Sequence, residues 1–311
     1  MKINFFFAIL LNYLVVLNSY TFSENEVFIE IKIENEIITN IDINYEKNYL
    51  IALNNKLENL NNDQLYNLAK DSLAREKIKK VELEKTFDLK KNDNLTNVLI
   101  KNLYKNLNLN NIKEFENYLD AYNLKIKDIR EKILIERLWN KLIFEKFNKN
   151  LIINKENLKK QLEDQVKKNK LEEFNLKEIM FELKVNEKLE QKSKHILDFI
   201  KKNGFENAAN IFSISDSAKF GGSLGWINKA QISKNILNEI NDAQIGEITK
   251  PIQVNSTYLI LKLENKRKKE VKINIEKELE KLIIYEKEKQ LNNYSLMFFN
   301  KVKKNIYINE S

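Results

Sequence analysis

Apolar and polar residues alternate near the start of the chain and then change to a helical spacing. Between residues 27 and 39, isoleucines at every second position are separated by charged residues, as in VFIEIKI. This period of two predicts one strand followed by a turn. Either Asn40 or Asp42 can cap a helix. The apolar positions that follow, beginning with Ile43 and Leu50, fall at helical spacing, so a helix is expected next.

The same helical spacing continues through the first half of the chain. It predicts helices over residues 61–85, 94–107, 111–120, 125–149 and 154–170. Asp63 and Asn110 are expected to cap two of them. Trp139 lies within an apolar stripe, and we interpret it as a packing residue. After Arg267 another amphipathic helical pattern follows, and the closing IYINES predicts a short strand.

The residues that mark turns, glycine and proline, are confined to one part of the chain. All five glycines and the only proline lie between Gly204 and Pro251. Glycine and proline mark sharp turns, so this window predicts a compact domain with turns and strands, flanked by long helices. The final amphipathic helix needs a partner, and the N-terminal helices are the economical choice. We therefore predict a mostly helical α+β protein whose helical module is discontinuous in sequence and carries an inserted domain.

The first segment reads as a secretory signal. Residues 1–23 begin with one lysine, continue with an apolar run from Ile3 to Leu17, and end in small polar residues. The apolar run is shorter than the roughly 20 residues that a membrane span needs. We expect cleavage of this segment and export to the periplasm, with an uncleaved membrane anchor as the alternative.

Composition excludes several kinds of chemistry. The chain has 311 residues, no cysteine and a single histidine, His195. Disulfides, thiolate catalysis and cysteine- or histidine-rich metal sites are therefore excluded. The net charge of +8 is spread through glutamate-rich helical segments, which favours solvated helix faces over a nucleic-acid interface. We expect no metal, no cofactor and no nucleic-acid partner.

Three motifs follow one another between Phe174 and Lys266. They are GGSLGW at residues 221–226, GEITKP at 246–251 and YLILKL at 258–263. Together with the predicted order of strands and helices, they resemble a parvulin-type (PpiC-like) prolyl isomerase domain. The resemblance implies a βαααβαββ-type domain that needs neither metal nor nucleophile. Such a domain lowers the barrier about a peptide bond by binding the twisted imide in a dry pocket.

The resemblance fails at the family's two usual histidines. Glu178 stands where the first strand usually carries histidine, and Leu259 stands where the last strand carries the second. Ser215 matches a loop position that is often cysteine or aspartate in the family. The triplet HIL at His195 falls in the following helix and is interpreted as a decoy. We predict Glu178, Ser215 and Leu259 as degenerate catalytic positions and expect weak or absent catalysis, with an active isomerase as the alternative.

The apolar floor of the family's groove is retained, with a polar residue at its rim. The resemblance implies that six residues bind polypeptide: Leu224, Trp226, Ile227, Ile232, Ile236 and Ser256. Individually, such apolar positions are equally compatible with a role in the core.

A second resemblance lies near the N-terminus. IKIENEIITNIDI, from Ile31 to Ile43, resembles the opening of SurA-type chaperones. This resemblance implies a signal peptide over 1–23, a helical chaperone domain over 24–170, a parvulin-like domain over 171–266 and a C-terminal helix over 267–311. It also implies an ATP-independent periplasmic chaperone for unfolded polypeptides, chiefly outer-membrane β-barrel precursors. A membrane-anchored foldase is the alternative if the first segment is retained.

Overall fold

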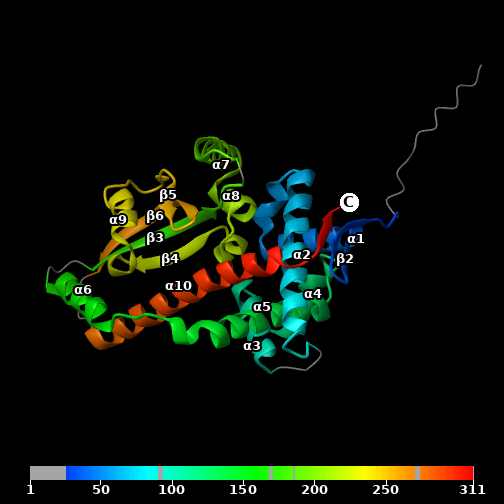
Figure 1. Cartoon of the computed structure of the whole chain (residues 1–311), viewed down its shortest axis with the longest axis horizontal. Helices are drawn as coiled ribbons and strands as arrows, with labels where there is room; N and C mark the ends of the chain where they lie inside the picture. The colour runs from blue at the N-terminus through cyan, green and yellow to red at the C-terminus, as the bar shows by residue number, and fades with distance from the viewer. Residues whose placement is uncertain (1–25, 90–93, 168–170, 185, 270–273, 311) are drawn as a thin grey trace, which may run out of the picture.

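A long C-terminal helix joins the two parts of the molecule. The computed structural model describes residues 26–89, 94–167, 171–184, 186–269 and 274–310. An N-terminal helical module and a small sheet domain lie along α10 (Ile275–Lys304) (Figure 1). The predicted signal segment, residues 1–23, lies outside the described residues. Among those that are described, no helix is long and apolar enough to cross a bilayer.

The N-terminal segment forms a hairpin instead of a single strand. β1 (Ile29–Ile33) pairs antiparallel with β2 (Glu36–Thr39) across a two-residue turn in which Glu34 has φ 50°. The segment expected to be a turn is therefore mostly a second strand. The predicted closing strand is confirmed: β7 (Ile308–Glu310) pairs with the other edge of β1. The first two and the last of the described strands thus share one sheet, in the order β2-β1-β7.

Helices make up the rest of this module, close to the predicted ranges. They are α1 (Asn40–Leu53), η1 (Asn55–Asn59), α2 (Asn62–Glu84), α3 (Asn94–Asn106), α4 (Ile112–Asp120), α5 (Ile126–Phe147), η2 (Asn148–Asn150) and α6 (Lys155–Lys167).

The predicted helix caps were wrong by one to three positions. Thr39 caps α1 in a capping box with Asp42, and Asn61 rather than Asp63 caps α2. Asn111 rather than Asn110 caps α4. In these asparagine-rich segments several adjacent side chains could serve, and the one that reaches the backbone N–H of the third helical residue becomes the cap.

The C-terminal end of α10 packs into the N-terminal core. Phe299 and Val302 are buried in one cluster with Trp139 of α5. The indole Nε1–H of Trp139 donates a 2.8 Å hydrogen bond to Ser295 Oγ on α10. Trp139 is 1% exposed, as expected for a packing residue. The amphipathic pattern of α10 thus finds its partner on α5.

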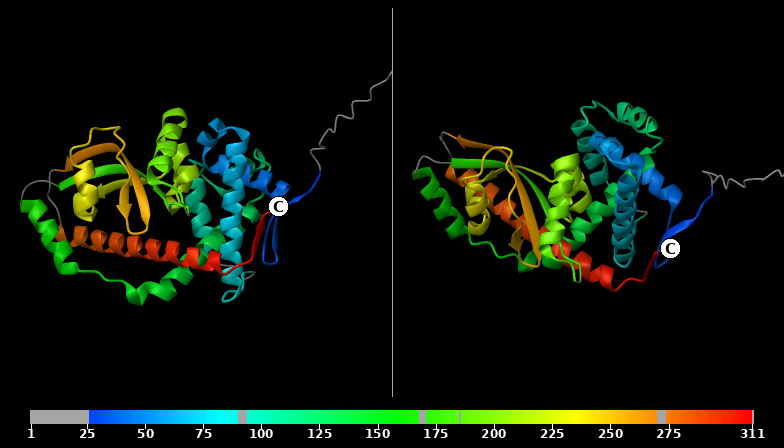
Figure 2. Two further views of the ribbon diagram at one scale, coloured as in Figure 1. Left: turned by 45° about the horizontal axis from the view of Figure 1, so that its top comes forward. Right: turned by 90° about the horizontal axis from the view of Figure 1, so that it is seen from above.

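The sheet domain has four antiparallel strands with helices on its faces. Its elements are β3 (Leu171–Phe181), α7 (Leu189–Asn203), α8 (Phe205–Phe212), η3 (Asp216–Phe220), β4 (Ser223–Asn228), η4 (Lys229–Gln231), α9 (Lys234–Ile240), β5 (Ile252–Val254) and β6 (Thr257–Lys269). The strand order is β4-β3-β6-β5. α7 and α8 cover one face of the sheet, and Figure 2 shows α10 running beside both the sheet domain and the N-terminal helices.

Candidate functional site

Alternation along β3 assigns its side chains to two different cores. Ile179 and Phe181 are buried against α7 and α8. Leu176 belongs to the core on the opposite face, and Met180 packs against that core. Because side chains alternate along a strand, Glu178 shares this second face. We call it the groove face, because four of the six residues predicted to bind polypeptide, Leu224, Ile227, Ile232 and Ile236, lie on it.

Glu178 is buried and hydrogen-bonded by two hydroxyl groups. Glu178 is 8% exposed. Its Oε1 accepts hydrogen bonds from Ser215 Oγ at 2.6 Å and from Ser217 Oγ at 2.9 Å. Burial raises the pKa of the Glu178 carboxyl, the two hydroxyl groups act against that shift, and the negative charge of Asp216 adds to it. The predicted pair Glu178 and Ser215 is therefore in direct contact.

Ser217 is a member of this cluster that the sequence analysis missed. The Ser217 hydroxyl also lies 3.2 Å from that of Ser215, within the short η3 turn. The sequence offered one indication of its role, namely a second serine two residues after Ser215. The Ser217 side chain reaches Glu178 because of the 3-10 geometry of η3, which the sequence pattern did not predict.

The Gly-Gly pair brings the loop against β3. Gly221 and Gly222 have φ of 64° and 76°, values that residues other than glycine rarely adopt. The backbone N–H of Glu178 donates to the carbonyl oxygen of Gly222 at 2.8 Å. A Cβ added at Gly222 would lie 2.2 Å from the Glu178 carbonyl oxygen. Glycine at 222 is thus required for the contact that places the Glu178 carboxyl beside the two serines.

The predicted apolar residues divide into core and surface positions. Leu259 and Ile227 are 5% and 4% exposed and belong to the core of the groove face. Leu224, Ile232 and Ile236 are only partly buried and pack against this core from outside. Leu259, which we predicted to match the family's second histidine, therefore supplies an apolar contact in the core of the groove face.

The remaining two predicted residues lie elsewhere. Trp226 is 38% exposed, and the guanidinium of Arg267 lies over its ring at 4.0 Å from the centroid. Ser256 is exposed in the turn between β5 and β6. His195 is exposed on α7, with its ring edge-on to Phe212 at 5.3 Å. The interpretation of His195 as a helix residue outside the first strand is confirmed.

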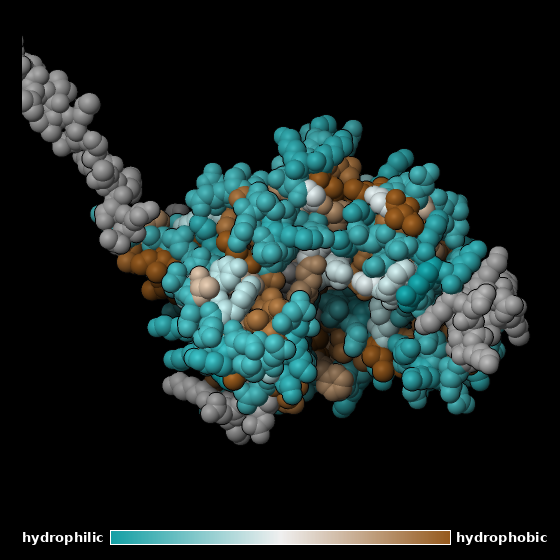
Figure 3. All heavy atoms as spheres, turned by 180° about the vertical axis from the view of Figure 1, so that it is seen from behind, coloured by the Kyte–Doolittle hydropathy of each residue, from teal (hydrophilic) through white to brown (hydrophobic). Residues whose placement is uncertain are grey.

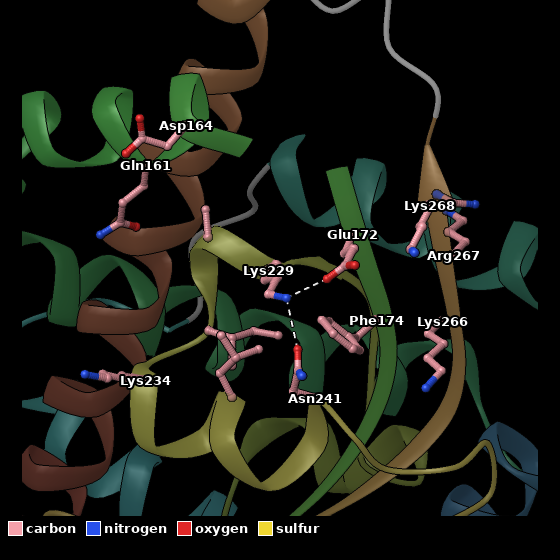
Figure 4. A pocket seen from close by; sticks show the side chains of 13 residues that line it. Gln161, Asp164, Glu172, Phe174, Lys229, Lys234, Asn241, Lys266, Arg267 and Lys268 are labelled. Carbon is pink, nitrogen blue, oxygen red and sulfur yellow. Dashed lines mark hydrogen bonds and ion pairs between the residues drawn. The ribbon is translucent and has the colours of Figure 1, made fainter. Parts of the chain in front are cut away.

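Two hollows adjoin the groove face. A cavity of about 140 Å³ lies beside Glu178, Ser215 and Leu224. A wider cleft of about 910 Å³ lies farther along, lined by Phe174, Ile232 and several basic side chains. There Lys229 points toward Glu172 and Asn241, with contacts of 2.5 and 2.9 Å (Figure 4).

The arrangement can bind a peptide but lacks the family's usual titratable pair. One buried carboxyl with two hydroxyl donors can form hydrogen bonds with a backbone amide, and the partly buried aliphatic residues offer apolar contact. Leu259, which the sequence analysis predicted to stand at the second histidine position, contributes no proton donor.

Residues 174–265 match the family described as the PPIC-type PPIASE domain, or rotamase. A stretch of 63 residues is 36% identical to chaperone SurA of Pseudomonas putida, which amounts to 20% of this chain and 15% of that protein.

Solved structures similar to this chain have low superposition scores. A PpiC-type peptidyl-prolyl isomerase domain is 26% identical, with a TM-score of 0.29 and coverage of 32% of this chain and 95% of that one. A SurA-like chaperone of Campylobacter jejuni is 18% identical, with a TM-score of 0.29 and coverage of 76% and 94%. PrsA from Bacillus subtilis is 20% identical, with a TM-score of 0.29 and coverage of 76% and 83%. Residues 174–265 therefore form a PpiC-type PPIase domain, in a chain that is similar to the chaperone SurA.

Proposed function

We propose that this protein is a periplasmic, ATP-independent chaperone that binds unfolded polypeptides, chiefly outer-membrane β-barrel precursors, and isomerises prolyl bonds weakly or not at all. One observation carries the proposal: the groove face has partly exposed aliphatic residues. Glu178 and Leu259 stand where the family resemblance predicts the two histidines, which supports weak or absent catalysis. Binding needs the apolar surface, but efficient catalysis also needs groups that favour the twisted imide over the planar one.

A second cleft, between the N-terminal helices and the PPIase domain, supports polypeptide binding away from the groove face. It has a volume of about 250 Å³ and lies between the N-terminal helices and α8. Its apolar lining comes mainly from Leu50, Leu53, Leu68 and Phe212, and charged residues also line it. From behind, the molecule has a hollow near its middle, with hydrophilic residues in its depth and hydrophobic residues at its edges (Figure 3). Barrel precursors expose alternating apolar side chains before they close, which suits such a surface.

The proposal includes a division of the chain. Residues 24–170 and 267–311 would form the chaperone module, with the parvulin-like domain over 171–266 inserted between them and residues 1–23 removed on export. Mass spectrometry of the mature N-terminus tests the last point. A chain that keeps residues 1–23 would indicate a membrane-anchored foldase instead.

Exchange NMR on a short aromatic-proline peptide tests binding and catalysis in one sample. Residues 24–311 are titrated into the peptide; shifts report binding, and cis/trans exchange reports catalysis. We expect shifts without faster exchange. Exchange as fast as that caused by an ordinary parvulin would contradict the proposed loss of catalysis, and the absence of shifts would contradict binding.

A separate experiment tests which class of unfolded polypeptide the protein binds. The protein should suppress aggregation of an unfolded outer-membrane barrel protein more than that of an unfolded helical soluble protein, without ATP. Equal suppression of both would remove the barrel precursors from the proposal while leaving general chaperone activity.

An active isomerase is the second candidate, favoured by the contact between Glu178 and Ser215. In that case Glu178→Ala and Ser215→Ala would each reduce the exchange rate in the same NMR assay. His195→Ala is the matched control, because His195 is exposed on α7 away from this cluster. Unchanged exchange in Glu178→Ala would exclude a catalytic contribution from the carboxyl.

A further inference from the structure

The N-terminal half of α10 lies against the groove face. Tyr285 packs against the core of that face, to which Leu259 belongs. Leu224, Ile232 and Ile236 pack against the same core. The ring of Tyr285 therefore shares the apolar surface on which a bound polypeptide would lie.

The same helix also closes the space beside Glu178. The cavity of about 140 Å³ has Glu178, Ser215 and Leu224 on one side and Asn292 and Leu296 of α10 among its other walls. Tyr285, Asn292 and Leu296 are separated by seven and four residues, which places them on one face of the helix. One helix face thus meets both the apolar and the polar part of the predicted site.

The surroundings of Tyr285 agree with this placement. Burial raises the pKa of Tyr285 to about 12, and the negative charges of Glu178 and Glu286 act in the same direction. An influence of Glu178 on Tyr285 requires the two side chains to be near each other, although their residues lie on β3 and α10.

Contacts at the rim hold the helix in this position. Leu282, one turn before Tyr285, is 2% exposed and forms a buried pair with Leu162 of α6. Ala230 of η4, beside the predicted groove residue Ile232, packs against this pair. The helix is therefore attached to the PPIase domain at the edge of the groove face.

We propose that α10 is the resident occupant of the groove face, so that Tyr285 takes part of the place of a bound polypeptide and any client segment binding there must displace it. The inference rests on the proposed function in one respect only, namely that the groove face binds polypeptide. The apparent affinity for a client is then reduced by the fraction of molecules in which α10 is seated.

Peptide affinity in the mature chain tests the competition. Tyr285→Ala should bind a fluorescent Phe-Pro peptide about tenfold more tightly than the wild type, if the seated form outnumbers the open form by that factor. Tyr285→Phe keeps the ring and should behave as the wild type. Ile284→Ala is the matched control on the same helix, because Ile284 is 54% exposed. Circular dichroism at the assay temperature checks that all variants are folded.

A second readout separates this inference from the proposed function. The chain has no cysteine, so Leu224→Cys introduces a single thiol on the groove face. Its rate of alkylation should rise when Tyr285→Ala is added and stay unchanged with Ile284→Ala. If labelling rises but no variant binds the peptide, occupancy by α10 stands and peptide binding by the groove face fails. If labelling and affinity are both unchanged by Tyr285→Ala, the occupancy is refuted even where the wild type binds the peptide.

Discussion

The hydroxyl of Ser215 donates a 2.6 Å hydrogen bond to Oε1 of Glu178, and a second hydroxyl, that of Ser217, donates to the same oxygen at 2.9 Å. Neutral donors satisfy this oxygen, but they offset the loss of hydration of a charged carboxylate only in part. Burial therefore raises the pKa of Glu178. The cluster favours a protonated carboxyl more than a surface glutamate would.

The first prediction concerns the pH dependence of stability. Since the pKa of Glu178 is higher in the folded state than in the unfolded state, its contribution to stability is fully present below the unfolded pKa and is lost as pH rises through the folded pKa. The glutamine of Glu178→Gln is neutral at every pH in question, so it carries no such dependence. The variant should therefore gain free energy of unfolding relative to the wild type between about pH 4 and about pH 7, by at most about 1.4 kcal/mol for each unit of pKa difference.

Urea unfolding at both pH values measures this difference. Glu46, whose pKa burial also raises, is present in both proteins, so its effect cancels in the comparison. A constant gap between wild type and variant across the range would contradict the raised pKa of Glu178.

The second prediction compares two glycines of the GGSLGW motif. Gly222→Ala forces a Cβ to 2.2 Å from the Glu178 carbonyl oxygen at a φ of 76°, whereas Gly225→Ala meets only open space at a φ of 68°. Backbone strain alone should cost Gly225→Ala about 1 kcal/mol, and the added clash should bring Gly222→Ala to about 3 kcal/mol or more. Thermal unfolding of both variants measures this; equal losses would mean that the loop moves away from β3 without cost.

The sequence predicted the helical segments and the order of elements in the PPIase domain, because both depend on local periodicity and turn residues. It also predicted Glu178 and Ser215 as site positions, and the structure places these two side chains in contact. It did not identify the exact caps, nor the second strand of the hairpin, whose turn at Glu34 lacks a glycine. Neighbouring residues compete to cap a helix or to form a turn, and the local sequence pattern does not decide which of them does so.

Long-range placement was harder to predict. The amphipathic pattern of α10 indicated a buried face but not which of its residues would meet the N-terminal core and which the groove face. Phe299 contacts the first and Tyr285 the second, and contacts between segments far apart in the sequence decided this. Trp226 was assigned by motif to the binding surface, yet the structure pairs it with Arg267, which lies far along β6.

The third prediction concerns a buried ion cluster in the N-terminal module. Lys132 Nζ lies 2.6 Å from Glu46, which is 1% exposed, and also contacts Glu76. Lys132→Met leaves an uncompensated buried carboxylate and should cost about 3–5 kcal/mol of unfolding free energy. Lys127→Ala, which removes an exposed pair with Glu131 at 3.8 Å, should cost at most about 0.5 kcal/mol.

A second substitution separates charge from packing in this cluster. Adding Glu46→Gln to Lys132→Met removes the unpaired charge and should recover part of the lost stability. Urea unfolding of the two variants gives the difference. Failure of the double variant to recover any stability would show that the aliphatic stem of Lys132 matters more than its charge.

The fourth prediction concerns the attachment of α10 to α5. The indole Nε1–H of Trp139 donates to Ser295 Oγ at 2.8 Å, and Trp139 is almost fully buried. Ser295→Ala leaves that N–H without its partner and should cost about 1–3 kcal/mol. In a Trp139→Phe background the same substitution should cost much less, because no donor remains to be satisfied. Urea unfolding of the four proteins in this cycle gives the coupling energy, which we expect to be about 1 kcal/mol or more. A coupling energy near zero would mean that apolar contacts such as those of Phe299 hold α10 on the N-terminal module without help from this hydrogen bond.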